Sequence, residues 1–253
     1  MLKQANVTEL KKPGNAVVYL VPGAFALLFV VLFALRRIGA YYGTVDGFQP
    51  VLYATRKLVW VFAVLTAVCL AGAIFGKKPW MRTVGRYGAV MMALALVSAF
   101  MLSKYWTEKL MFLYLLHAVV YCLYMVYQLY RMEFFAYSLA TAVSGCVFFF
   151  FSKGVALNTR GILLGILMLA ALAFVALLAA TAAKNGGVVR WGKKRVRVLP
   201  ETFNPMVLYV VCAVWLVCLP LCFLFGASFA YYCMFAAIAL ELIAAVYYTF
   251  QLK

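Results

Sequence analysis

Residues 114–131 read YLLHAVVYCLYMVYQLYR, and this stretch shows what kind of fold the chain adopts. In steps of three and four residues, polar-capable side chains recur on one face of a helix, while Leu, Val, Ala and Met fill most other positions. The residues of this stripe are Tyr114, His117, Tyr121, Tyr124, Gln128 and Arg131. A helix this apolar lies in lipid, so its polar stripe has to face protein or water.

The composition of the whole chain indicates a membrane protein. Of its 253 residues, 68% are hydrophobic and 11% are charged, and the mean hydropathy is +1.02. A soluble domain has about half apolar and about a quarter charged residues. We therefore expect an all-α, polytopic transmembrane helical bundle, with residues 1–253 forming a single integral membrane domain.

Apolar runs separated by turn and basic residues predict about eight spans. The expected helices cover residues 16–35, 58–75, 87–103, 110–130, 134–151, 161–183, 206–226 and 229–250. Residues 36–57 are expected to form a loop, because they contain three glycines and a proline. The last two helices have almost no linker between them, so they are expected to form a tight hairpin.

The net charge of +17 comes from Lys and Arg residues that cluster at the ends of the apolar runs. This distribution is typical of orientation by the positive-inside rule and of attraction to anionic lipid headgroups. An amino terminus in the cytoplasm leaves most basic residues inside, so both termini are predicted to be cytoplasmic. Because the charge has this role, nucleic acid is not an expected partner.

The longest basic segment covers residues 184–205. Its part VVRWGKKRVRV, residues 188–198, alternates apolar and polar residues around a glycine, which predicts a short cytoplasmic β-hairpin against the membrane surface. The residues expected to contact anionic lipid or a partner are Arg190, Lys193, Lys194, Arg195 and Arg197.

A short internal similarity raises the hypothesis of a tandem repeat of four spans. The triplet Gly-Lys-Lys at residues 76–78 returns at residues 192–194, at an offset close to half the chain. The repeats would be residues 1–133 and 134–253, in parallel orientation. The alternative is chance, because short basic and apolar strings recur easily in such a composition.

Glu241 is the only acid deep inside a predicted span. A charged carboxylate there costs about 3 kcal/mol on insertion scales, so the group must be protonated, paired or facing water. Two interpretations stay open: a site for a solute, an ion or a proton, or a hydrogen-bonded contact between helices. Tyr248 lies on the same helical stripe.

His117 is the only histidine, and it could reach Glu241 if the helices at residues 110–130 and 229–250 touch. The alternative is that His117 and the tyrosines around it serve hydrogen bonding and aromatic packing within the bundle. The candidate ligand or proton contacts are Glu241, His117, Tyr121, Tyr124, Tyr114 and Tyr248.

Motifs for catalysis and for metal binding are missing from the sequence. It has no G-x-S-x-G, H-E-x-x-H or P-loop motif, and its single aspartate, Asp46, cannot make a magnesium cluster. Its seven cysteines include no C-x-x-C pair, and membrane-buried cysteine usually acts as a small hydrophobe. We therefore expect no enzyme activity, no cofactor and no metal.

The sequence leaves two main hypotheses for the function of the chain. The leading hypothesis is a transporter or channel whose polar site lies between the helices at residues 110–130 and 229–250. The alternative is a non-catalytic membrane subunit or sensor of a larger complex, which docks a partner or anionic lipid through the basic loop at residues 184–197. A membrane enzyme with an unrecognised motif is a third and weaker hypothesis.

Overall fold

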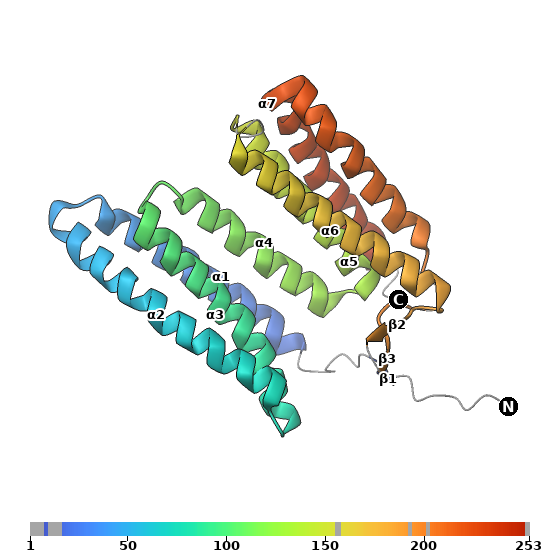
Figure 1. The fold of residues 1–253 in the computed structure, drawn as a ribbon, viewed down its shortest axis with the longest axis horizontal. Coiled ribbons are helices and arrows are strands. Elements are labelled where there is room, and N and C mark those ends of the chain that lie inside the picture. Colours follow the sequence, from blue (N-terminus) through green and yellow to red (C-terminus); the bar gives the residue numbers. More distant parts are fainter. Residues whose placement is uncertain (1–7, 10–16, 155–157, 192–193, 201–202, 251–253) are drawn as a thin grey trace. The chain divides into compact units, whose positions relative to one another are not determined.

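The computed structural model describes residues 8–9, 17–154, 158–191, 194–200 and 203–250, and these form long helices with three short strands (Figure 1). The helices are α1 (Val17–Tyr42), α2 (Val45–Phe75), α3 (Pro79–Tyr105), α4 (Leu110–Leu129), α5 (Met132–Ser152), α6 (Thr159–Lys184) and α7 (Pro205–Phe250). The strands are β1 (Thr8–Glu9), β2 (Val188–Trp191) and β3 (Lys194–Arg197). Seven helices within these ranges are long and apolar enough to cross a membrane, which gives the chain the character of a multi-pass integral membrane protein.

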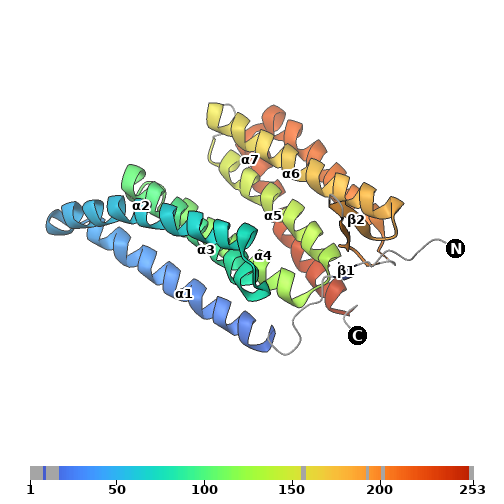
Figure 2. The same ribbon diagram turned by 60° about the horizontal axis from the view of Figure 1, so that its bottom comes forward.

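The chain divides into two compact units. Unit 1 consists of Met1–Val21 and Cys122–Lys253, and unit 2 consists of Pro22–Tyr121. Unit 1 therefore contains the strands, the last turns of α4, and α5 to α7 (Figure 2). Unit 2 contains most of α1, all of α2 and α3, and the first turns of α4.

The loop expected at residues 36–57 is helical in the structure, so that prediction is wrong. α1 continues to Tyr42, and α2 already begins at Val45. Thr44 caps the start of α2, because its Oγ1 accepts a hydrogen bond from the backbone N–H of Gly47 at 3.1 Å. The connection is thus a tight turn between two long helices.

Tyr42 supplies the tertiary contacts that hold this turn in place. Its hydroxyl donates to the carbonyl of Leu102 at 3.1 Å and lies 2.9 Å from Oγ1 of Thr55. Its ring belongs to a buried apolar cluster with Leu35 and Leu52. These contacts outweigh the local turn preference of the glycines, as tertiary packing commonly outweighs propensity.

The backbones of α2 and α3 approach each other closely. A Cβ atom on Gly85 would lie only 2.8 Å from the carbonyl oxygen of Cys69 and still closer to the backbone nitrogen of Ala73. A Cβ atom on Gly88 would lie 2.9 Å from Sγ of Cys69. Small residues commonly allow such close helix packing in membranes, so the glycines determine this contact.

The structure assigns seven helices where the sequence predicts about eight spans. The predicted helices at residues 206–226 and 229–250 are one element, α7, because helical geometry resumes directly after the single non-helical residue Gly226 (φ 77°, ψ −159°). The chain reverses there: Cys222 and Cys233 interact within one buried cluster, although a straight helix would separate them by about 16 Å. Figure 1 shows the resulting N-terminal and C-terminal arms of α7 side by side.

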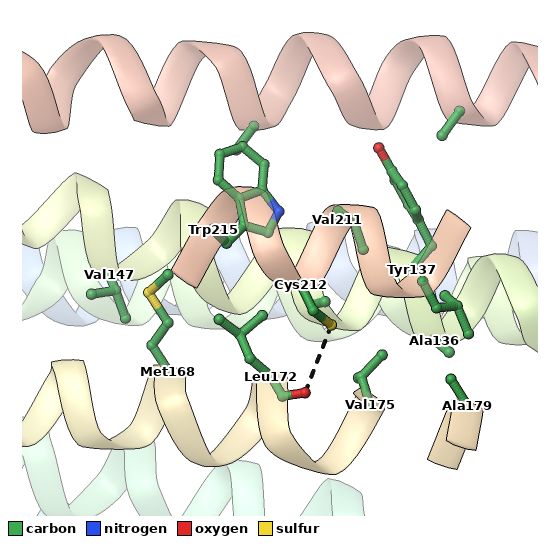
Figure 3. Packing of buried hydrophobic residues seen from close by; sticks show 14 of the residues in the cluster. Ala136, Tyr137, Val147, Met168, Leu172, Val175, Ala179, Val211, Cys212 and Trp215 are labelled. Carbon is green, nitrogen blue, oxygen red and sulfur yellow. Dashed lines mark hydrogen bonds between the residues drawn. The ribbon is translucent and has the colours of Figure 1, made fainter. Parts of the chain in front are cut away.

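The core of unit 1 lies between α5, α6 and α7 (Figure 3). Trp215 of the N-terminal arm packs against Phe148 of α5, with ring centroids 5.7 Å apart. On the α6 side, the thiol of Cys212 donates to the carbonyl of Leu172 at 3.7 Å, and Met168 is fully buried. The large side chains of Trp215, Phe148 and Met168 therefore fill the core between α5, α6 and α7.

The strands form one sheet in the order β1-β3-β2. β2 pairs antiparallel with β3, and β1, which precedes α1, pairs in parallel with β3. The sheet is joined to α6 through Gly187 (φ 83°), whose N–H donates to the carbonyl of Ala182 at 2.8 Å. A side chain on Gly187 would collide with the carbonyl of Leu199, so this joint requires glycine.

Gly85→Ala is expected to destabilise the protein, because the added methyl group meets backbone atoms of α2 that cannot rotate away. We expect a loss of about 1–3 kcal/mol, the usual range for overpacking. The measurement is the melting temperature of the purified protein in detergent. Gly23→Ala in α1 is the matched control, since nothing lies within 4 Å of its added Cβ. Equal melting of the two variants would contradict the close contact.

Candidate functional site

α5 and the C-terminal arm of α7 run antiparallel and contact each other along much of their length. Near the start of α5, the ring of Phe134 stacks on that of Tyr248, with centroids 4.9 Å apart. Further along, Gly145 faces Ala237, whose Cβ would be 3.4 Å from a Cβ on the glycine. Glu241 lies between these two contacts and therefore well inside the helix pair.

Only one of the two carboxyl oxygens of Glu241 makes a hydrogen bond with the described residues. Its Oε1 accepts a hydrogen bond from the hydroxyl of Ser138 on α5, at 2.5 Å. Its Oε2 is buried and has no hydrogen-bond partner among the described residues. Tyr137 and Cys122 lie within electrostatic range of the carboxyl, and no Lys or Arg in the described ranges interacts with it.

Glu241 also lies far from the end of its helix. It stands nine positions before Phe250, the last residue of α7, which corresponds to about 14 Å along the helix. A hydrocarbon core is about 30 Å thick, so a helix arm that crosses it would carry this carboxyl near the middle. An ionised carboxylate without a cation is costly in hydrocarbon.

Three more buried polar atoms on α5 and the N-terminal arm of α7 make no hydrogen bond of normal geometry with the described residues. They are the hydroxyl oxygens of Thr141 and Ser144 and the indole Nε1 of Trp215. The Thr141 hydroxyl also interacts with the side chain of Tyr137. Figure 3 shows the Trp215 indole turned away from α6. Together with Ser138 and Glu241, these three residues form a set that we call the polar seam: Ser138, Thr141, Ser144, Trp215 and Glu241.

Unpaired polar atoms at this burial are uncommon in folded proteins. More than about 90% of buried polar groups have a protein or water partner, and an unmade hydrogen bond costs about 1–3 kcal/mol. Several such atoms on α5 and the two arms of α7 therefore indicate a place where water or a polar ligand binds. Chemically, the seam offers one carboxyl group, three hydroxyl groups and one N–H donor.

Glu133, the buried acid of α5, is paired within the protein. The hydroxyl of Tyr248 donates to its Oε1 at 3.0 Å, and the backbone N–H of Asn204 also donates to the carboxyl. Glu133 lies in the first turn of α5, where the helix dipole favours a negative charge. Tyr248, a predicted ligand contact, therefore has a partner in Glu133 rather than in Glu241.

His117 has its partners within unit 2. Its Nδ1 lies 2.8 Å from the carbonyl of Leu113, and its Nε2 lies 3.4 Å from the hydroxyl of Ser98. The ring is buried, with 3% of its surface exposed. The structure therefore gives His117 and Glu241 separate hydrogen-bond partners, and a joint role for them stays a prediction.

The tyrosine stripe of α4 takes part in packing. Tyr121 is buried in a cluster with Leu28 and Leu94, and Tyr114 packs against the cluster around Tyr42. Tyr124 is half-buried. Their predicted role as ligand contacts stays a prediction.

The basic residues predicted to contact lipid or a partner lie on the strands of the sheet. Arg190 is on β2, and Lys194 and Arg195 are on β3, but their side chains lie outside the described part of the structure. Lys193 lies outside the described residues, and Arg197, on β3, is half-buried.

Metal ligands do not cluster in the part of the chain that the structure describes: no three His, Cys, Asp or Glu side chains are arranged there to hold an ion. Comparison with known proteins adds no family: no family model, no curated protein and no solved structure matches the chain. Function therefore has to be argued from the site itself.

Sequence reasoning selected Glu241 but missed the hydroxyl residues of the polar seam. Ser138, Thr141 and Ser144 recur every three residues in α5, a spacing that was available as a signal. Serine and threonine in membrane helices often bond only to their own backbone, so the spacing alone does not predict a site. Burial without a backbone partner is what distinguishes Thr141 and Ser144.

Proposed function

We propose that the chain is a transport-type membrane protein rather than an enzyme, and that Glu241 takes up and releases a proton during transport. The observation that carries this proposal is the carboxyl oxygen Oε2 of Glu241, which is buried near the middle of the C-terminal arm of α7 without a partner among the described residues. Intramembrane acids of this kind usually serve ion or proton pathways.

The surroundings of Glu241 favour a proton over a metal cation. A bound cation needs several oxygen ligands at once, whereas Glu241 brings a single carboxyl group to the seam. The hydrogen bond from Ser138 to Oε1 stabilises the carboxylate after its proton has left. Oε2 is free to carry the proton when the group is neutral.

This proposal places the site between other helices than the leading hypothesis from the sequence did. The helices at residues 110–130 and 229–250 were expected to form it together. The hydrogen bond from Ser138 supports a site between α5 and the C-terminal arm of α7, with Glu241 kept from the original set.

Glu241→Gln is expected to abolish proton flux while the protein is still made and folded, because the amide cannot take up a proton. The measurement uses proteoliposomes loaded with a pH-sensitive dye and an imposed membrane potential. Glu133→Gln is the matched control and should retain flux, since Glu133 is paired outside the seam. Flux in Glu241→Gln equal to that of the unmodified protein would show that the acid is structural.

We also propose that each arm of α7 crosses the membrane, which gives eight crossings and places both termini in the cytoplasm. The parallel pairing of β1 with β3 supports an even number of crossings by α1 to α6, because both strands must lie on the same side. Each arm has about 20 residues, enough for one crossing. The basic residues of the sheet favour the cytoplasmic side.

The crossings of α7 are testable with reporter fusions in a bacterial host. Alkaline phosphatase fused after Ser228 is expected to be active, because that position would lie outside, and a fluorescent protein there should stay dark. Fusions after Asn185 should give the reverse pattern. The same pattern at both positions would mean that the N-terminal arm does not cross.

A second candidate function is a non-catalytic subunit or sensor that docks anionic lipid or an acidic partner through the sheet. The register of β2 and β3 places Arg190 directly opposite Arg195. Like charges at opposed positions destabilise a strand pair, so an anion near them would compensate. In addition, the most apolar stretch of α2 has no residue buried within the chain, which leaves a flank for lipid or a partner helix.

Replacing Arg190, Lys194 and Arg195 together by Gln is expected to weaken binding of anionic phospholipid, with each lost contact costing about 1 kcal/mol. Retention of phosphatidylglycerol by the purified protein is measured by native mass spectrometry. The matched control replaces Lys77, Lys78 and Arg86, which removes the same charge from the α2–α3 connection and the first turns of α3. Equal lipid retention by both variants would eliminate a specific role for the sheet.

A further inference from the structure

The hydroxyls of the polar seam follow one another along α5. Thr141 and Ser144 come one and two turns after Ser138, the residue that donates to Glu241. Both are fully enclosed, with 2% and 0% of their surfaces exposed. Neither hydroxyl oxygen makes the usual bond to its own helix backbone. In the described part of the protein the Ser144 hydroxyl has no partner, and the Thr141 hydroxyl interacts with the side chain of Tyr137.

The spacing of these groups matches single water molecules. Residues three apart on a helix have Cβ atoms about 5–6 Å apart, and an O–H···O hydrogen bond measures about 2.7–2.8 Å. Two such hydrogen bonds through one water therefore span about the distance between successive hydroxyls. A buried water needs two to four polar partners, and Oε2 of Glu241 and the hydroxyls of Thr141 and Ser144 can supply them.

Trp215 adds a donor at the far end of this row. Its ring packs on Phe148, which lies one turn beyond Ser144 on α5. Its indole N–H has no partner among the described residues and can only donate. A group that only donates can hold a water but cannot pass a proton on. The path for the proton therefore depends on the hydroxyls of α5.

We propose that the polar seam binds a row of water molecules which, together with Thr141 and Ser144, forms a proton relay along α5 from Glu241 as far as Ser144. The proposal rests on the proposed proton function of Glu241 and names its path. Chemically, the ligand of the seam is water, and the transferred species is the proton.

Each step of the relay conserves atoms and charge. The proton on Oε2 of Glu241 passes to the adjacent water, which gives one of its own protons to the hydroxyl of Thr141. That hydroxyl gives its original proton to the next water, and the step repeats at Ser144. One proton leaves the row for each proton that Glu241 gives up, and no other group gains a charge.

The test measures hydrogen–deuterium exchange of the Glu241 carboxyl by infrared spectroscopy of the full-length protein in lipid after transfer to D₂O. The carboxyl band is assigned by its loss in Glu241→Gln. We expect Thr141→Val and Ser144→Ala each to slow the exchange by about tenfold, because each removes one hydrogen-bonded step. Thr66→Val in α2 is the matched control, since the Thr66 hydroxyl bonds to its own helix, at the carbonyl of Phe62.

The outcomes separate the relay from the proposed transport function. Exchange in the Thr141→Val and Ser144→Ala double variant as fast as in the Thr66→Val control would overturn the relay, as would the absence of any carboxyl band that Glu241→Gln removes. Slowed exchange without proton flux in proteoliposomes would support a water-filled seam and contradict transport by Glu241. Slowed exchange together with slowed flux would support both.

Discussion

The hydrogen bond between Ser138 and Glu241 is the interaction on which the organisation of unit 1 depends. Hydrocarbon offers no partner to a carboxyl group, so the helix that carries Glu241 has to face another polar element at the same depth. α5 supplies that element, and its antiparallel contact with the C-terminal arm of α7 follows from the need to enclose the acid. The aromatic contact of Phe134 with Tyr248 and the close approach of Gly145 to Ala237 fix the same register.

The two acids of this helix pair show how position determines what a carboxyl group can do. Glu133 lies at the end of its helix, where a tyrosine hydroxyl and a backbone N–H satisfy it. Glu241 lies well inside the C-terminal arm of α7 with one oxygen bonded and one oxygen unpaired within the described ranges. The first acid ties the start of α5 to the end of α7 and to the segment before α7. The second retains an unused bonding position, which is a requirement for any group that exchanges a proton.

Much of the fold could be predicted from the sequence, because long apolar runs have few alternatives to membrane helices. The loop at residues 36–57 was predicted wrongly, since the contacts of the Tyr42 hydroxyl come from residues distant in sequence. The number of helices differs because a single residue, Gly226, is enough to reverse the chain without a linker.

The candidate site was harder to predict from the sequence than the fold. Glu241 stands out in an apolar run, but the choice of Ser138 as its partner depends on which helices pack together, and periodicity does not specify that. Ser144 and Thr141 were overlooked because hydroxyl residues are common in helices and only burial reveals an unused one.

The parallel pairing of β1 with β3 has a consequence for biosynthesis. Thr8 is made 188 residues before its partner Val196. At about 5–20 residues per second, β1 therefore waits roughly 10–40 s before the ribosome delivers β3. The sheet forms only after α1 to α6 have been synthesised, and it joins the segment that precedes α1 to the one that follows α6.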